Sequence, residues 1–111
     1  MTRQAALGEF EQLVLLAVLG LGEGAVGVEI ARVLEEKAGR RVSRGALYSA
    51  LDRLEAKGFL GWSEAEAVPE RGGHPMRRFA VTRRGVAALR EARQAVRRLS
   101  AGLDGILGEG G

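Results

Sequence analysis

The stretch VSRGALYSALDRLEAKG, residues 42–58, has the pattern of a short amphipathic helix with a marked start and end. Ser43 can accept a hydrogen bond from the first turn, and Gly58 can close the last one. Apolar residues between them recur at steps of three and four, which predicts one buried face. That face consists of Leu47, Ala50, Leu51 and Leu54. The other side of the helix carries Arg44, Gly45, Tyr48, Ser49 and Asp52.

Two more helices are expected upstream of this one. Residues 9–19 are apolar on nearly every side after an acidic first turn, which predicts a buried helix that ends near residues 20–24. The next segment has the pattern of a half-exposed helix, with Gly39 placed to end it. Its apolar positions are Val28, Ala31, Leu34 and Ala38. Three short helices within residues 9–58 are typical of a helix-turn-helix.

Downstream of Gly58 the hydrophobic period changes. LGWSE at residues 60–64 and RRFAV at residues 77–81 are rich in aromatic and branched residues, so they predict two strands. Residues 68–75 contain both prolines and a Gly-Gly pair, and we expect them to form a loose hairpin tip. Two strands that follow such a helix form a wing.

Alternation along the second strand assigns its side chains to two faces. Phe79 and Val81 should face the core, Arg77 shares their side, and Arg78 should face solvent. We expect Trp62 to be a core anchor under the wing.

The last segment predicts a helix that begins at Thr82 and runs to about residue 107. A narrow apolar row follows it at alternating steps of three and four, as in a helix that packs on another helix. The row consists of Leu89, Ala92, Val96, Leu99, Leu103 and Ile106. It packs either on the chain's own first helix or on a second copy. Because the first helix is apolar all round and needs cover on more than one side, we expect a homodimer.

The predicted fold is therefore mainly α with a small β-hairpin. Residues 1–81 should form a winged helix-turn-helix domain, residues 82–107 a dimerisation helix, and residues 108–111 a disordered tail.

Charge is distributed unevenly along the chain, although the net charge is only +3. Residues 1–70 carry 8 basic and 11 acidic side chains, whereas residues 71–98 carry 9 arginines and the single acid Glu91. A near-neutral protein with one strongly basic segment is typical of binding to a polyanion, and double-stranded DNA is the partner we expect. The alternative is a basic helix face that is merely solvated.

Two groups of residues are candidates for DNA contact. The third helix would place its N-terminal residues in the major groove. Its candidates are Ser43, Arg44, Gly45, Tyr48 and Ser49. The wing would hold the flanking backbone through basic side chains, because arginine suits phosphate oxygens and narrow minor grooves. Its candidates are Arg71, His74, Arg77 and Arg78.

Each group also has an alternative explanation. Tyr48 can be an amphipathic residue at the rim of the core, and the wing arginines can pair with nearby acids. Those acids are Glu64, Glu66 and Glu70. His74 is the only histidine in the chain and has no second ligand nearby, so we expect no metal site.

Several classes of function are excluded by what the sequence lacks. Without cysteine there is no disulfide framework, thiolate zinc site or cysteine nucleophile. The usual catalytic motifs are also absent, so we expect neither an enzyme nor a cofactor. The most apolar run, residues 13–19, is far shorter than the roughly 20 residues of a membrane span, and no signal peptide precedes it. We expect a cytoplasmic protein with no membrane partner.

Three stretches of the chain resemble the PadR family of transcriptional regulators. They are LGEFEQLVLLAVL at residues 7–19, GALYSALDRLEAKGFL at residues 45–60, and RRFAVTRRG at residues 77–85, and the likeness spans about residues 7–90. The resemblance implies a dimeric winged-helix repressor that binds an inverted-repeat operator and is often released by a small molecule. Tyr48 would be the aromatic residue of the recognition helix, and Arg77 and Arg78 the basic residues of the wing.

Two departures from the family pattern concern the effector. Val26 stands where family members usually place an aromatic residue before the glycine of the second helix, and only one C-terminal helix is expected, as in the small subgroup. The resemblance itself implies a small apolar or aromatic effector as a further partner. Two other functions remain as alternatives. One is a winged-helix protein–protein adaptor, and the other is a dimer that binds a small molecule without DNA.

Overall fold

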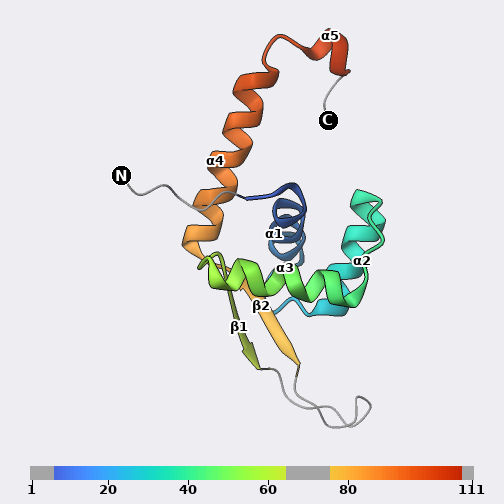
Figure 1. Ribbon diagram of the computed structural model, residues 1–111, viewed down its shortest axis with the longest axis vertical. Coiled ribbons are helices and arrows are strands. Elements are labelled where there is room, and N and C mark those ends of the chain that lie inside the picture. Colours follow the sequence, from blue (N-terminus) through green and yellow to red (C-terminus); the bar gives the residue numbers. More distant parts are fainter. Residues whose placement is uncertain (1–6, 65–75, 109–111) are drawn as a thin grey trace.

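The computed structural model describes residues 7–64 and 76–108. Its elements follow one another as α1 (Glu9–Leu21), α2 (Gly27–Ala38), α3 (Arg44–Ala56), β1 (Leu60–Glu64), β2 (Arg77–Val81), α4 (Arg83–Ser100) and α5 (Asp104–Leu107). Helices α1 to α3 form a body from which the antiparallel strands β1 and β2 extend, and α4 projects from the opposite end (Figure 1). This is the predicted winged helix-turn-helix, mainly α with a small β-hairpin.

The helix ends follow the predicted local signals. The hydroxyl of Ser43 accepts a hydrogen bond from the N–H of Ala46 at 3.1 Å, and the hydroxyl of Thr82 accepts one from the N–H of Gly85 at 3.1 Å. Gly39 follows α2 with φ of 65°, and Gly58 follows α3 with φ of 82°. Glycine tolerates this left-handed conformation without a steric cost, so both helices end where a glycine stands.

The core is built where the three body helices meet the strands. The predicted stripe of α3 is buried in full. Helix α1 buries one face, whereas Leu16 and Leu19 on its other side are exposed. The largest fully buried side chains are Phe59, Phe79, Leu15, Ile30, Leu34, Leu51, Leu54, Val14 and Val18. The prediction for α2 was wrong in part, because Val28 is 63% exposed while Ile30 and Leu34 face the core. Its N-terminal turn lies at the edge of the body, so Val28 has no element over it.

Strand β2 lies between β1 and the chain before α2. Leu60 pairs with Val81 and Trp62 with Phe79, while the N–H of Phe79 donates to the carbonyl oxygen of Ala25 at 2.7 Å. This inner position buries Phe79, as predicted. The prediction for Trp62 was wrong, because β1 is the outer strand and leaves this side chain 39% exposed, with its indole N–H donating to Glu55 at 2.8 Å.

The junction between β2 and α4 is tightly packed against the end of α3. The Thr82 hydroxyl donates to the carbonyl oxygen of Gly58 at 2.7 Å while it caps α4. A side chain at Gly85 would collide with the carbonyl oxygen of Phe59. The hydroxyl and the glycine together let α4 start directly against the body.

The predicted single C-terminal helix is wrong beyond Ser100. Gly102 has φ of 83°, the chain turns there, and Leu103 and Ile106 belong to the turn and to α5 (Figure 1). Leu89 is also misassigned as a dimer contact, because it is buried in the core of the single chain. The first turns of α4 pack on α1, so the exposed part of the apolar row begins after Leu89. Residues 109–111 of the predicted tail lie outside the described residues.

Candidate nucleic-acid interface

The N-terminal half of α3 presents polar side chains on the outer face of the body. Ser43, Arg44, Gly45 and Ser49 are all exposed. The oxygen of Ser43 accepts the capping hydrogen bond, and the hydroxyl of Ser49 accepts a hydrogen bond from Arg53 at 3.3 Å. Arg44 forms no ion pair with any carboxylate among the described residues. Its guanidinium carbon lies 5.8 Å from the ring centre of Tyr48, and none of these carboxylates neutralises its charge.

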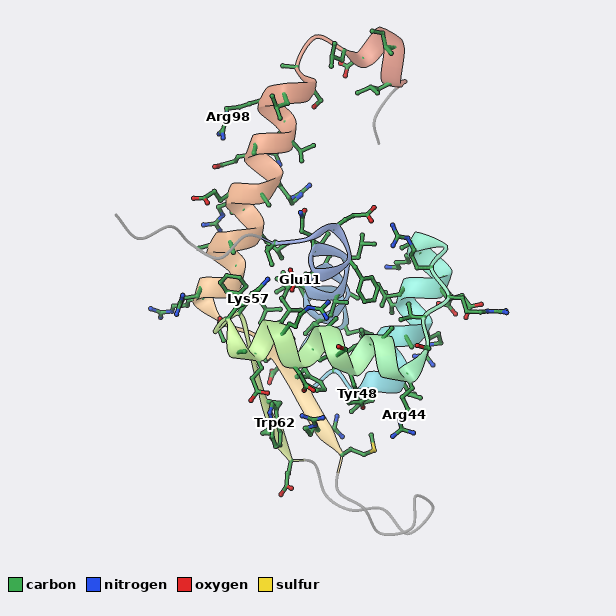
Figure 2. All side chains as sticks on the ribbon, in the orientation of Figure 1. Glu11, Arg44, Tyr48, Lys57, Trp62 and Arg98 are labelled. Carbon is green, nitrogen blue, oxygen red and sulfur yellow. The ribbon has the colours of Figure 1, made fainter. Side chains whose placement is uncertain are left out.

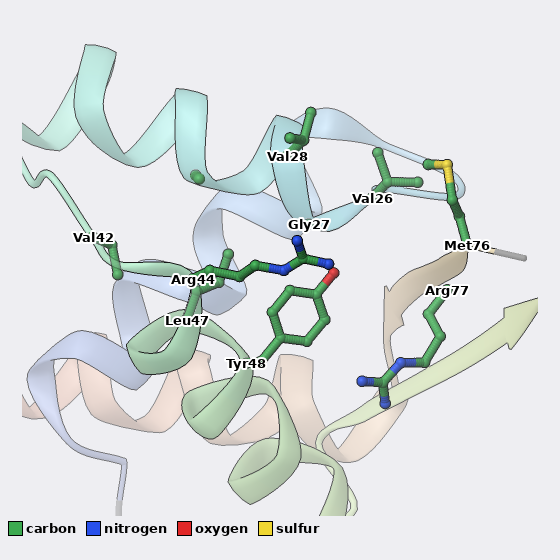
Figure 3. Close-up of a pocket in the computed structure, with 10 residues that line it drawn as sticks. Val26, Gly27, Val28, Val42, Arg44, Leu47, Tyr48, Met76 and Arg77 are labelled. Atoms are coloured by element: carbon green, nitrogen blue, oxygen red, sulfur yellow. The ribbon is translucent and has the colours of Figure 1, made fainter. Parts of the chain in front are cut away.

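Tyr48 lies where α3, α2 and β2 meet (Figure 3). Its ring packs edge-on against Phe79, with 6.4 Å between the ring centres, and the residue is only half-buried. Its hydroxyl lies against the backbone of Gly27, where a Cβ atom would collide with it. Tyr48 thus fits the description of a residue at the rim of the core, with part of its ring still open to solvent.

Arg77 is surrounded by aromatic rings. Its guanidinium carbon lies 5.4 Å from the ring centre of Tyr48, 5.1 Å from that of Trp62 and 5.6 Å from that of Phe79. One guanidinium nitrogen is 3.8 Å from a carboxylate oxygen of Asp52 on α3. The side chain of Arg77 is 33% exposed. The sequence indicated that Arg77 and Phe79 share a side but not that α3 supplies the carboxylate.

Arg78 points the other way, as the alternation predicts, and is exposed. Its guanidinium donates to the carbonyl oxygen of Gly24 at 2.9 Å. Glu64 stands opposite Arg77 in the strand register, but within residues 7–64 and 76–108 neither wing arginine forms an ion pair with it. Arg71, His74, Glu66 and Glu70 lie outside the described residues.

A groove of about 930 Å³ connects the two groups of candidates. Apolar side chains of α2, α3 and the segment before β2 line it, and Arg44, Tyr48 and Arg77 border it. In Figure 3 the side chain of Arg44 extends past Tyr48 towards Gly27, while Arg77 comes from β2. Helix α3 and the wing therefore share one continuous surface with two guanidinium groups.

The buried carboxylate of Glu11 on α1 forms ion pairs with two partly exposed basic side chains at the C-terminal end of α3. The carboxylate of Glu11 accepts hydrogen bonds from Lys57 at 2.9 Å, from Arg53 at 3.3 Å and from the N–H of Gly8 at 2.8 Å. Burial raises the pKa of Glu11, but the hydrogen bonds and the positive charge of Lys57 outweigh it, so the pKa lies below its ordinary value. Sequence analysis missed this cluster, because an acid in a first turn is expected at any exposed helix start.

Two basic residues begin α4, directly after β2 and Thr82. Arg83 and Arg84 are exposed, and the guanidinium carbon of Arg84 lies 6.0 Å from the ring centre of Phe59. The described residues hold no group of acidic or histidine side chains that could bind a metal ion. No helix in this part of the chain is long and apolar enough to cross a membrane. The groove bordered by Arg44, Tyr48 and Arg77 offers positive charge and a concave shape to a ligand.

Comparisons with known proteins agree with this architecture. The model of the transcriptional regulator PadR-like family matches residues 15–91. A PadR-like transcription factor from Bacteroides fragilis is 26% identical, with a TM-score of 0.70, over 87% of this chain and 88% of that chain. A PadR family transcriptional regulator from Eggerthella lenta is 26% identical, with a TM-score of 0.68, over 92% of this chain and 88% of that chain.

The protein hsRosR-S4, solved as a complex, is 30% identical, with a TM-score of 0.68, over 86% of this chain and 76% of that chain. Comparison with curated proteins gave no sequence match. The family consists of regulators rather than enzymes, in agreement with the prediction from the sequence. Because the family model covers well over half of its residues, the chain belongs to the PadR-like family of transcriptional regulators.

Proposed function

We propose that the protein is a homodimeric repressor that binds an inverted-repeat DNA operator through α3 and the wing. The observation that carries the proposal is the surface shared by α3 and β2, where Arg44, without a carboxylate partner among the described residues, borders the same groove as Arg77. A helix with basic and polar residues at its N-terminal end fits the major groove, and a neighbouring basic strand fits the flanking backbone. Figure 2 places Arg44, Tyr48 and Trp62 at one end of the molecule.

The proposed DNA contacts come from the candidates derived from the sequence, apart from Arg77, and exposure and hydrogen bonding support some of them more than others. Arg44 and Arg78 are exposed and suit phosphate, whereas Ser43 and Ser49 already accept hydrogen bonds within the chain. Gly45 has nothing within 4 Å of its missing side chain, so a base edge or sugar has room to approach there. Arg71 and His74 stay in the proposal as contacts from the hairpin tip.

Dimerisation is proposed through the exposed apolar face of α4, together with α1. Val96 is 60% and Leu99 is 82% exposed, and Leu16 and Leu19 of α1 are exposed as well. Two-fold symmetry would then set the two half-sites about 10 bp apart. The same apolar surfaces suit a small apolar or aromatic effector that releases the repressor, and a rise in melting temperature with such a compound would test that part.

The salt dependence of DNA binding tests the interface. If three arginines of each protomer contact phosphates, a dimer neutralises about six, and the logarithm of affinity should fall with the logarithm of salt at a slope near −5. Arg44→Ala should reduce the magnitude of that slope by about one per protomer. Arg98→Ala is the matched control, because Arg98 is exposed far along α4 from this surface (Figure 2).

The measurement is fluorescence anisotropy of a labelled duplex at several salt concentrations. Equal slopes for Arg44→Ala and wild type, or an equal loss with Arg98→Ala, would contradict the assignment of this face. Binding that does not depend on salt would contradict the proposed interface as a whole. Absence of any DNA binding would instead favour the adaptor or the small-molecule-binding dimer.

A further inference from the structure

The cluster around Arg77 joins elements that are far apart in the sequence. We define the Arg77 cluster as Arg77, Phe79, Trp62, Tyr48 and Asp52. Tyr48 and Asp52 belong to α3, Trp62 belongs to β1, and the other two belong to β2. The guanidinium of Arg77 therefore contacts side chains of the recognition helix and of both wing strands at once.

The position of Arg77 differs from that of a free phosphate-binding arginine. Its guanidinium carbon is within 5.6 Å of three ring centres and its charge faces the carboxylate of Asp52. Cation–π contacts of this kind are attractive, and more strongly so when they are shielded from water. Binding a phosphate would require Arg77 to leave these partners, whereas Arg78 on the same strand would give up one hydrogen bond to a backbone carbonyl.

The wing is also attached to the body at its base, where Leu60 and Phe79 are buried in the core. A two-stranded hairpin is marginally stable by itself, so its direction depends on the contacts at its base. Besides the Arg77 cluster, the described residues provide the hydrogen bond from Phe79 to Ala25, the one from Trp62 to Glu55, and the one from Arg78 to Gly24. Among these attachments only the Arg77 cluster joins both strands to α3 through one side chain.

We propose that Arg77 is a positioning residue, which sets the angle between the wing and α3, and that it does not contact DNA phosphate. The inference rests on the proposed DNA-binding function. A protein that reads bases with α3 and holds the backbone with the wing needs both elements at a fixed distance. Loss of the cluster should therefore reduce the preference for the operator more than it reduces affinity for random DNA.

The test compares Arg77→Ala and Arg77→Lys with Arg78→Ala as the matched control on the same strand. The operator is a duplex selected from a randomised pool by the wild-type protein. Arg77→Ala should lower the ratio of operator affinity to random-duplex affinity about tenfold and leave the salt slope on random DNA unchanged. Arg78→Ala should lower both affinities alike and reduce the slope by about one per protomer.

The variant Arg77→Lys distinguishes a positioning role of Arg77 from a role of its positive charge alone. Arg77→Lys keeps the positive charge but lacks the planar guanidinium that stacks on rings. A positioning residue should not be rescued by it, so the operator preference should stay low. A phosphate contact should be largely rescued, because lysine binds phosphate as a point charge. Rescue by lysine, or a slope that falls in Arg77→Ala as it does in Arg78→Ala, would overturn the proposal.

A readout without DNA distinguishes this inference from the proposed function. Trp62 is the only tryptophan of the chain, so the fluorescence of the free protein reports on the Arg77 cluster. Arg77→Ala should change the emission of Trp62, and Arg78→Ala should not. An unchanged emission in Arg77→Ala would overturn the cluster whether or not DNA binds. If wild type bound no DNA but the emission changed, the proposed function and the role in DNA reading would fail, while the cluster itself would be established.

Discussion

At the residue scale, Gly85 carries a constraint that its backbone angles do not reveal. Its φ is negative, yet a Cβ atom would collide with the carbonyl oxygen of Phe59 and lie 2.7 Å from a side-chain carbon of Val81. Neither neighbour can retreat without moving the start of α4. Gly85→Ala should therefore lower the free energy of unfolding by about 2–3 kcal/mol, measured by urea denaturation.

Gly45 provides the matched control for this substitution. It lies in the first turn of α3 with nothing within 4 Å of the missing side chain. Gly45→Ala should raise the stability by about 0.5–1 kcal/mol, because alanine restricts the unfolded chain and favours the helix. Similar losses of stability in both variants would show that close packing is not the reason for Gly85.

Glu11 predicts a pH dependence of stability. Its folded pKa lies below the ordinary value of 4.5, so its contribution is fully present above that pH and disappears as pH falls through the lower folded value. Glu11→Gln should cost about 1–3 kcal/mol at neutral pH through the lost charged hydrogen bonds. At about pH 3 the difference from wild type should be smaller. Urea unfolding of both proteins at the two pH values measures this difference in stability. A difference that grows on acidification would contradict the lowered pKa of Glu11.

The residues that were predicted well depend on local signals. Ser43, Thr82 and Gly39 act within one turn of the chain, so the sequence around each of them is sufficient. The exposure of Trp62, by contrast, depends on which of the two strands has a neighbour on both sides. That order follows from the hydrogen bond between Phe79 and Ala25, a long-range contact without any sequence pattern.

At the element scale, the packing of α2 on α3 depends on Gly27. A methyl group there would collide with the hydroxyl of Tyr48 and come within 3.1 Å of its ring. Gly27→Ala should therefore turn the ring away and destabilise the protein by about 1–3 kcal/mol in urea unfolding.

A double variant checks the origin of this cost. The nearest atom is the phenolic oxygen, so adding Tyr48→Phe should restore part of the stability lost in Gly27→Ala. The effects of the two substitutions should thus be non-additive. Strict additivity would mean that the cost of alanine at Gly27 arises elsewhere, for example at the start of α2.

The limits of periodicity are clearest in α4. The apolar steps of three and four continue through Leu103 and Ile106, although the helix has ended at Ser100. The hydrophobic pattern alone does not register this break, while Gly102, in a left-handed conformation just after the helix, marks it. Similarly, the row does not reveal that Leu89 is covered by the chain's own body, because a buried face looks the same whichever helix covers it.

At the scale of the whole molecule, the basic segment of the sequence contributes to the two parts that project from the body. The described arginines of residues 76–98 are divided between the wing and α4, which project from opposite ends of the body (Figure 1). The charge pattern predicted a polyanionic partner, in agreement with a family of transcriptional regulators. It could not show which arginines belong to which structural environment. The structure assigns them three environments: the Arg77 cluster, the exposed wing, and the exposed surface of α4.

The proposed homodimer can be tested at Leu99. Leu99 is 82% exposed on α4, and a homodimer would bury one copy from each protomer. Burying a leucine side chain is worth about 1.5–3 kcal/mol, so removing both should weaken the dimer by at least about a hundredfold. Leu99→Glu should therefore sediment as a monomer at concentrations where wild type is a dimer. The control is Val28→Glu, which places the same charge at an exposed apolar position on α2, away from α4 (Figure 1). It should remain dimeric, and a wild-type protein that sediments as a monomer would contradict the two-fold model of operator reading.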